Sequence, residues 1–169
     1  MKLIKVLVAD DSALMRRSLK EILESSREIE VIGTARDGED VLQKAAELKP
    51  DVITLDINMP KMDGITALKQ IIKKEIAPVI MVSSLTQENA QITFDALEIG
   101  AFDYVAKPGG TVSSNIKEVT RDLIRKVKAA SGIGVVKRLS RKSIAEPQPI
   151  SKTIYKSGIV SNKFSYKAI

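Results

Sequence analysis

The chain has 169 residues, 44% of them hydrophobic, which is enough for one ordinary domain with an aliphatic core and an extension. It contains no cysteine, which excludes disulfides and thiolate metal sites, and no histidine, which excludes a Ser-His-Asp triad within this chain. Neither an apolar run of about 18 residues nor a signal-peptide pattern is present, so we predict a soluble, cytoplasmic chain without membrane insertion.

The net charge of +6 is unevenly distributed along the chain. From Gly132 onward there are eight basic residues and one acid, so residues 1–131 carry a net charge of about −1. A basic segment can attract nucleic acid or acidic lipid, but a solvated linker is the more common origin of such a composition. We therefore interpret the charge excess as that of a linker.

Apolar runs and helical periods alternate along the first 130 residues. The runs predict five strands, at residues 3–9, 29–35, 52–56, 79–83 and 104–106. Between them, apolar side chains recur at helical spacing. The inner face of the first helix is predicted to hold Leu14, Ser18, Ile22 and Leu23. The fifth helix is predicted to have Asn115 as its N-cap and to end near Ala130.

Five successive strand–helix units predict an α/β fold, a doubly wound five-stranded parallel sheet with helices on both faces. The runs at residues 3–9 and 52–56 are almost continuously apolar, as expected for strands that are buried on both faces. Because crossover connections are right-handed, few topologies remain, and we predict the flavodoxin-like order 2-1-3-4-5.

We predict a domain boundary where this alternation stops. Residues 1–130 form the predicted domain, and residues 131–169, with scattered Gly, Pro, Ser and Lys, are interpreted as a flexible basic linker. The last seven residues, 163–169, have a pattern that could start another strand but are too few for a domain. Two interpretations stay open: a piece of a longer protein whose next domain begins near residue 163, and a receiver that stands alone.

Charged side chains follow three of the predicted strands. Asp10 and Asp11 follow the first, Asp56 ends the third, and Lys107 closes the fifth. Because the carboxyl ends of parallel strands meet at one edge of the sheet, we expect these four side chains to cluster there. Two carboxylates about 5 Å apart repel by roughly 3 kcal/mol at an effective dielectric of 20, so three of them need a cation. Oxygen-only ligands favour Mg²⁺, which accepts phosphate oxygens.

Each of these signals has an ordinary structural explanation when it is taken alone. An Asp-Asp-Ser sequence before a helix is typical of an N-cap, Asp56 fits a turn, and Lys107-Pro108 fits a loop. Ser83 fits a strand-end hydroxyl with no task. The coincidence of all of them at successive strand ends favours a functional site.

Four segments resemble, in order, the motifs of the response-regulator receiver domain of two-component signalling. They are Val8-Ala9-Asp10-Asp11-Ser12, Leu55-Asp56-Ile57-Asn58-Met59-Pro60-Lys61-Met62-Asp63-Gly64, Met81-Val82-Ser83-Ser84 and Tyr104-Val105-Ala106-Lys107-Pro108. The resemblance implies that Asp56 accepts a phosphoryl group from a histidine kinase. It further implies that Asp10, Asp11, Asp56 and the Asn58 carbonyl bind Mg²⁺, that Ser83 and Lys107 contact the phosphoryl group, and that Tyr104 changes rotamer on activation.

A narrower likeness is to the receivers of chemotaxis protein-glutamate methylesterases. It rests on Ser83-Ser84-Leu85-Thr86, residues 95–104 and Lys107-Pro108-Gly109-Gly110. Those proteins join a receiver through a linker to a Ser-His-Asp hydrolase domain that acts on chemoreceptors. The chain has no histidine and no glycine-rich serine loop. The resemblance thus implies methylesterase activity for a parent protein, and only self-phosphorylation and autodephosphorylation for these residues.

Three other functions are alternatives to regulation of an attached methylesterase. A stand-alone receiver would act as a phosphate sink or a motility partner. A DNA-binding regulator is disfavoured because residues 132–169 lack a two-helix apolar pattern, and no nucleic-acid partner is expected. A phosphatase of the same doubly wound class, working through an aspartyl phosphate, would need a substrate pocket that the sequence does not indicate.

Overall fold

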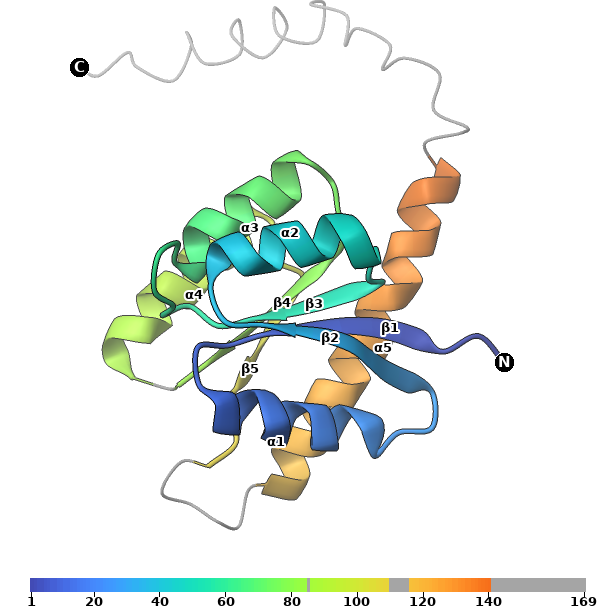
Figure 1. Cartoon of the computed structure of the whole chain (residues 1–169), viewed down its shortest axis with the longest axis horizontal. Coiled ribbons are helices and arrows are strands. Elements are labelled where there is room, and N and C mark those ends of the chain that lie inside the picture. Colours follow the sequence, from blue (N-terminus) through green and yellow to red (C-terminus); the bar gives the residue numbers. More distant parts are fainter. Residues whose placement is uncertain (85, 110–115, 141–169) are drawn as a thin grey trace, which may run out of the picture. The chain divides into compact units, whose positions relative to one another are not determined.

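The computed structural model describes residues 1–84, 86–109 and 116–140, with residues 133–140 described by their backbone alone. Residues Met1–Arg138 form one compact unit, in which strands and helices alternate along the chain (Figure 1). The elements are β1 (Ile4–Ala9), α1 (Ala13–Glu24), β2 (Ile29–Ala35), α2 (Gly38–Leu48), β3 (Val52–Leu55), α3 (Gly64–Lys73), β4 (Val79–Ser83), α4 (Gln87–Ile99), β5 (Asp103–Ala106) and α5 (Ile116–Ser140).

The five strands form one parallel sheet in the order β2-β1-β3-β4-β5, which confirms the predicted fold class and strand order. From β1 the chain first winds outward to β2 and then crosses back to β3 on the other side. The point at which the winding reverses lies between β1 and β3, where Ala9 is in register with Leu55. Ligands of doubly wound sheets bind beyond the strand ends at such a point.

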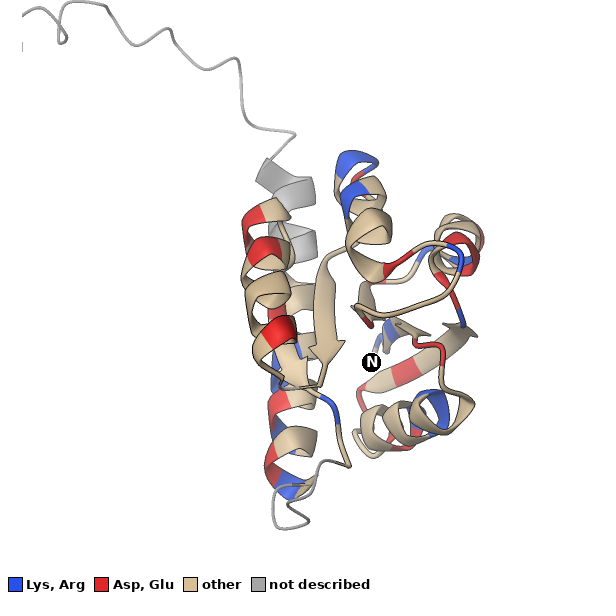
Figure 2. Cartoon of the chain, turned by 90° about the vertical axis from the view of Figure 1, so that its left-hand side faces the viewer, with Lys and Arg blue, Asp and Glu red and all other residues tan. Residues whose placement is uncertain are grey.

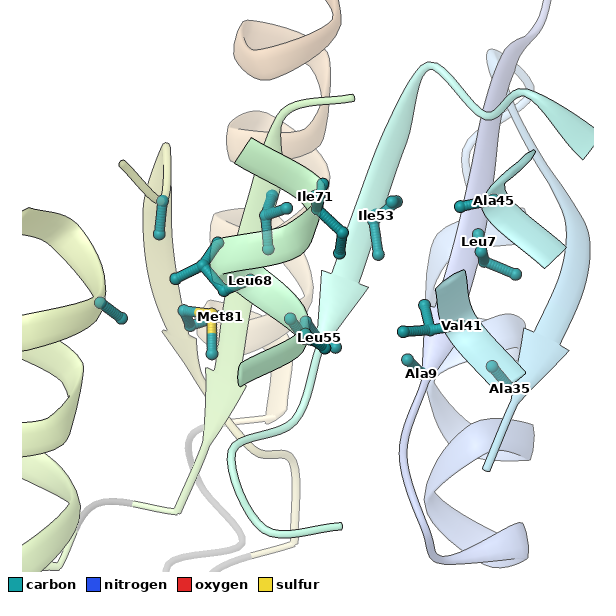
Figure 3. Packing of buried hydrophobic residues seen from close by; sticks show 14 of the residues in the cluster. Leu7, Ala9, Ala35, Val41, Ala45, Ile53, Leu55, Leu68, Ile71 and Met81 are labelled. Carbon is teal, nitrogen blue, oxygen red and sulfur yellow. The ribbon is translucent and has the colours of Figure 1, made fainter. Parts of the chain in front are cut away.

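Helices cover both faces of the sheet, so the strands are buried almost throughout. One core cluster joins alternate strand residues to α2, α3 and α4, and Figure 3 shows part of it. The second cluster joins the remaining strand residues to α1 and α5. In β1, Leu7 and Ala9 belong to the first cluster and Val6 and Val8 to the second, as the two-residue repeat of a strand requires.

Polar side chains that cap the backbone set the start of four helices among the described residues. The caps are Ser12 for α1, Asp37 for α2, Asp63 for α3 and Thr86 for α4. Each accepts a hydrogen bond from the backbone N–H three residues later, which satisfies one of the unpaired donors of the first turn. The caps fix the loops at the carboxyl edge of the sheet. The predicted cap Asn115 lies outside the described residues.

The predicted inner face of α1 is wrong at Leu14. Leu14 is 76% exposed, whereas Leu19 and Leu23 are buried and Met15 and Ile22 pack beside them. Positions 15, 19, 22 and 23 follow the i, i+4, i+7, i+8 repeat of a helix face, so the apolar stripe begins at Met15 and leaves Leu14 outside it.

The last helix, α5, continues to Ser140, beyond its predicted end near Ala130. Glycines at 132 and 134 indicated an end there, but a glycine in a helix interior costs only about 1 kcal/mol relative to alanine. A helix that is already nucleated on a packed core extends one residue at a time, so this cost does not stop it. Most of the predicted linker, residues 141–169, lies outside the described residues, and the predicted domain boundary stays a prediction.

Gly64, at the start of α3, is expected to tolerate no side chain. Its N–H donates to the Ile57 carbonyl at 2.8 Å, and a Cβ built on it would lie 1.9 Å from the Asp56 carbonyl oxygen. Because that neighbour is backbone, Gly64→Ala should lower the free energy of unfolding by about 3 kcal/mol, measured by urea denaturation.

Gly132→Ala is the matched control, because a Cβ there would meet nothing within 4 Å. It should raise the free energy of unfolding by about 0.5–1 kcal/mol, the helix propensity difference between the two residues. Unchanged stability of Gly64→Ala would contradict the close approach at Asp56. A destabilised Gly132→Ala would contradict a helix that continues past Ala130.

Candidate functional site

The three predicted carboxylates meet at the carboxyl edge of the sheet. Asp10 follows β1 and Asp56 follows β3, and the Asp56 N–H donates to the Ala9 carbonyl at 3.0 Å, which continues the pairing of the two strands by one residue. One carboxylate oxygen from each of Asp10, Asp11 and Asp56 lies within 4.8 Å of the others. Asp10 and Asp56 are buried, at 0% and 3% exposure, and Asp11 is exposed.

Lys107 reaches this acidic pocket from the end of β5. Its Nζ lies 2.9 Å from Asp10 Oδ2 and 2.9 Å from Asp56 Oδ2. Its backbone N–H donates to the Ser83 carbonyl at 2.9 Å, which ties the base of the side chain to the end of β4. The ammonium group thus occupies the position between two carboxylates of neighbouring strands, and it partly neutralises their repulsion.

Burial and charge pull the pKa values of this pocket in opposite directions. Burial raises the pKa of Asp56 above its ordinary value, the ammonium of Lys107 opposes this rise, and the charge of Asp10 adds to it. Burial by itself would lower the pKa of Lys107, but hydrogen bonds to the Asp10 and Asp56 carboxylates hold that pKa above its ordinary value. Lys107 is therefore a permanent cation at neutral pH.

The three residues of the Asp-Asp-Ser sequence differ in the contacts that they make. Ser12 caps α1, as its Oγ accepts from Met15 N–H at 3.3 Å. Asp10 uses Oδ1 to accept from Ser12 N–H at 2.9 Å and presents Oδ2 to Lys107. Asp11 makes neither contact, so its exposed carboxylate remains available to a ligand. The capping explanation therefore holds for Ser12, and the roles of Asp10 and Asp11 in a metal site stay predictions.

Asn58 lies on the loop between β3 and α3, two residues after Asp56, and is exposed. The loop is closed by the Gly64 N–H to Ile57 carbonyl bond, and it contains Lys61 with φ of 64°. Lys61 Nζ lies 3.8 Å from Asp37 Oδ2, so an ion pair links this loop to the start of α2.

Ser83 ends β4, where its carbonyl accepts from the Lys107 N–H, and Tyr104 lies on β5. Ser83 is 1% exposed, and its Oγ lies 3.4 Å from Thr93 Oγ1. Thr93 Oγ1 in turn donates to the Asn89 carbonyl at 2.7 Å. The sequence reasoning missed Thr93, although a hydroxyl in the buried stripe of a helix is a signal that could have identified it.

Tyr104 is 41% exposed. The Nζ of Lys126 lies 5.0 Å from the centroid of the Tyr104 ring. The sequence reasoning missed Lys126. A cavity of about 110 Å³ adjoins Tyr104. The cavity is lined by Ser83, Ser84, Asn89, Ala90, Thr93, Phe94, Leu97 and Tyr104. Ser83 and Tyr104 thus border the same space between β4, β5 and α4.

The residues of the acidic pocket fit a hard divalent cation. Asp10 Oδ2 and Asp56 Oδ2 are buried and, apart from the ion pairs to Lys107, have no hydrogen-bond partner among the described residues. The nearby donors are carboxylate oxygens, which suit ions such as Mg²⁺ rather than metals that prefer nitrogen or sulfur. The pocket therefore holds carboxylate oxygens that only Lys107 contacts among the described residues, and their chemistry suits such an ion.

Comparison with known proteins agrees with this geometry. Residues 6–118 match the response regulator receiver domain. The chain belongs to this family. A curated relative is protein-glutamate methylesterase/protein-glutamine glutaminase 3 of Syntrophomonas wolfei, 60% identical over 154 residues that cover 89% of this chain and 43% of the relative. The chain thus spans less than half the length of that relative, and the predicted likeness to a methylesterase receiver is confirmed.

Two solved structures extend the comparison to the fold. The response regulator domain of Thermotoga maritima CheB is 50% identical, with a TM-score of 0.70, and the match covers 78% of this chain and 98% of that one. A complex of the P1 domain of CheA3 with CheY6 from R. sphaeroides contains a match at 34% identity and a TM-score of 0.62. That match covers 77% of this chain and 100% of the other.

The described residues contain no helix that is long and apolar enough to cross a membrane.

The raised pKa of Asp56 predicts a pH-dependent difference between the wild type and Asp56→Asn without divalent ions. Above the ordinary carboxyl pKa of 3.8, the folded wild type holds more protons than the unfolded chain, so its stability falls as the pH rises through the raised pKa. Asn cannot lose a proton, so the wild type should lose stability relative to the variant as the pH rises, and the difference should level off above the folded pKa.

Urea denaturation at a series of pH values measures this difference. Asp95→Asn, on the exposed face of α4, is the control for a change of one charge. A wild type that gains stability relative to Asp56→Asn with rising pH would show that the ion pair with Lys107 outweighs burial at this site.

Proposed function

We propose that this chain is a phosphorylation switch that accepts a phosphoryl group on Asp56 from a chemotaxis histidine kinase and controls a methylesterase domain of a longer cytoplasmic protein. The observation that carries the proposal is the shared ion pair of Lys107 with Asp10 and Asp56, at 2.9 Å each. It brings a carboxylate nucleophile and a fixed cation to one pocket, and a phosphoryl group needs both.

The pocket residues would divide the chemistry as follows. Asp10, Asp11, Asp56 and the backbone carbonyl of Asn58 would hold Mg²⁺, which supplies positive charge for the transferred phosphoryl oxygens when it is bound. An Asp56 carboxylate oxygen forms the new bond to phosphorus while the bond from phosphorus to the donor nitrogen breaks. Lys107 and Ser83 would then contact the phosphoryl oxygens. The donor histidine belongs to another protein, because this chain has none.

Several features support the choice of partners. The match to CheY6 in complex with a CheA3 domain supports a chemotaxis kinase as the phosphate donor. The methylesterase relatives support a C-terminal hydrolase domain, through which the parent protein would act on chemoreceptors. Helix α4, at the front of Figure 2, carries acidic residues (Glu88, Asp95 and Glu98) and no basic one, which disfavours a nucleic-acid partner for that face.

Phosphorylation of Asp56 predicts a mass gain of one phosphoryl group after incubation with Mg²⁺ and a small acyl phosphate. Asp56→Asn should abolish this gain, because an amide is not a nucleophile for phosphorus under these conditions. Asp95→Asn should leave it unchanged. Intact-mass spectrometry gives the result, and a full gain by Asp56→Asn would place the acceptor elsewhere.

Removal of the Asp11 carboxylate should separate metal binding from folding. Among the described residues the Asp11 carboxylate is exposed and makes no hydrogen bond or ion pair, and it lies close to the Asp10 and Asp56 carboxylates, so Asp11→Asn should leave the stability of the metal-free protein unchanged or raise it by relieving their repulsion. Outer-shell partners of metal ligands are worth about tenfold in affinity or more, so a lost ligand should weaken Mg²⁺ binding by at least that factor. Thermal melts over a Mg²⁺ series measure both quantities. Equal Mg²⁺ stabilisation of the variant and the wild type would remove Asp11 from the ligand set.

Ser83, Thr93 and Tyr104 would transmit the change in charge. A phosphoryl group on Asp56 attracts the Ser83 hydroxyl, which now lies 3.4 Å from Thr93 Oγ1. Movement of Ser83 changes the cavity that Tyr104 borders, and the half-exposed ring can then turn inward. The surface of α4, β5 and α5 would thereby acquire two states, between which the phosphoryl group selects.

Hydrogen exchange with and without beryllofluoride tests this transmission. Protection should change in α4 and β5, as well as in the loops around the acidic pocket. Tyr104→Ala is expected to keep the changes in those loops and to reduce those in α4. Changes confined to the loops in the wild type would show that Tyr104 is a static strand residue.

A further inference from the structure

Asp11 is the one pocket carboxylate whose position no side-chain contact explains. It is exposed, and among the described residues no hydrogen bond or ion pair engages its carboxylate. One of its oxygens nevertheless lies within 4.8 Å of oxygens of Asp10 and Asp56. Its direction must therefore come from its backbone, which lies between the end of β1 and the Ser12 cap of α1.

The side chain of Arg16 holds this stretch of backbone. Arg16 Nη1 donates to the Asp10 carbonyl at 2.9 Å and to the Asp11 carbonyl at 3.1 Å. Arg16 itself lies in the first turn of α1, where its N–H donates to the Ser12 carbonyl at 3.0 Å. The guanidinium therefore reaches back over the turn that leads from the strand into the helix.

These two hydrogen bonds define the conformation of Asp11. The Asp10 carbonyl belongs to the peptide plane before the Asp11 Cα, and the Asp11 carbonyl belongs to the plane after it. Because the relative orientation of these two planes is set by φ and ψ of Asp11, one nitrogen bound to both carbonyls restricts both angles. It thereby restricts the direction of the Asp11 Cα–Cβ bond. Hydrogen bonds from a charged donor are the stronger kind, which suits this role.

We propose that Arg16 is a positioning residue that orients the Asp11 carboxylate toward a divalent cation in the acidic pocket. The proposal deepens the function proposed above, because it rests on the metal site assigned there. Arg16 acts through the backbone of a ligand, as the outer-shell partners of metal sites do. Its positive charge opposes a nearby cation, so orientation and electrostatics predict effects of opposite sign on Mg²⁺ affinity.

Two substitutions of Arg16 in the full 169-residue chain separate these effects. Arg16→Gln removes the charge and the reach, and Arg16→Lys keeps the charge on a side chain one bond shorter. Arg17→Gln is the matched control, since the adjacent arginine has the same charge but pairs on the surface with Glu21 at 3.2 Å. Unfolding in the absence of divalent ions gives the stability of each protein, and melts over a Mg²⁺ series give its Mg²⁺ dissociation constant.

Orientation by Arg16 predicts that Arg16→Gln weakens Mg²⁺ binding about tenfold or more, the usual effect of losing an outer-shell partner. Arg16→Lys should weaken it too, and Arg17→Gln should match the wild type. A dissociation constant that is unchanged or lower in Arg16→Gln overturns the proposal, even if that variant is less stable without Mg²⁺. A wild type that Mg²⁺ does not stabilise overturns the metal site of the proposed function, and the role of Arg16 with it. If the wild type binds Mg²⁺ and both Arg16 variants bind it as tightly as the wild type, the role of Arg16 alone is overturned.

Discussion

The ion pairs of Lys107 with Asp10 and Asp56 are the interactions on which the rest of the site depends. Two carboxylates about 5 Å apart repel each other by roughly 3 kcal/mol at an effective dielectric of 20, and burial here keeps solvent from screening them. The compensating charge comes from the end of β5, which is separated from β3 in the sheet by β4. The Lys107 ammonium therefore links the ends of β1, β3 and β5 in one pocket. The backbone N–H of Lys107 donates to the Ser83 carbonyl and so adds the end of β4.

The parallel sheet makes such a pocket possible, but it also requires that charged side chains be buried. Every strand ends at the same edge, and capped helices start there after short turns, so polar side chains are held in place by rigid elements. The cost is the burial of charge, which appears as a raised pKa of Asp56 and as carboxylate oxygens whose partner is Lys107. The surplus of negative charge at the site is balanced in part by the contacts of Lys107 with Asp10 and Asp56.

The chain belongs to the response regulator receiver family and is similar to methylesterases over less than half of their length. Contacts around the pocket extend to helices on both faces of the sheet. Ser83 is buried against Thr93 of α4, and both residues line the cavity that Tyr104 borders from β5. On the other side, Arg16 connects α1 to the backbone of Asp11. Hydrogen-bond contacts thus connect the pocket to α4 on one face of the sheet and to α1 on the other.

The sequence by itself determined the fold class, the strand order and the ends of four strands, whereas β3 ends at Leu55, one residue before the predicted Asp56. Continuous apolar runs, helical periods and right-handed crossovers leave few other arrangements, so Asp10, Asp56 and Lys107 had to share one edge. Only the tertiary structure decided that Lys107 bridges two carboxylates, that Leu14 is exposed and that α5 passes Ala130. It also revealed the contacts of Thr93 and Arg16. The physical reason is that periodicity fixes the face on which a side chain lies, whereas its partner depends on distances between elements far apart in the chain.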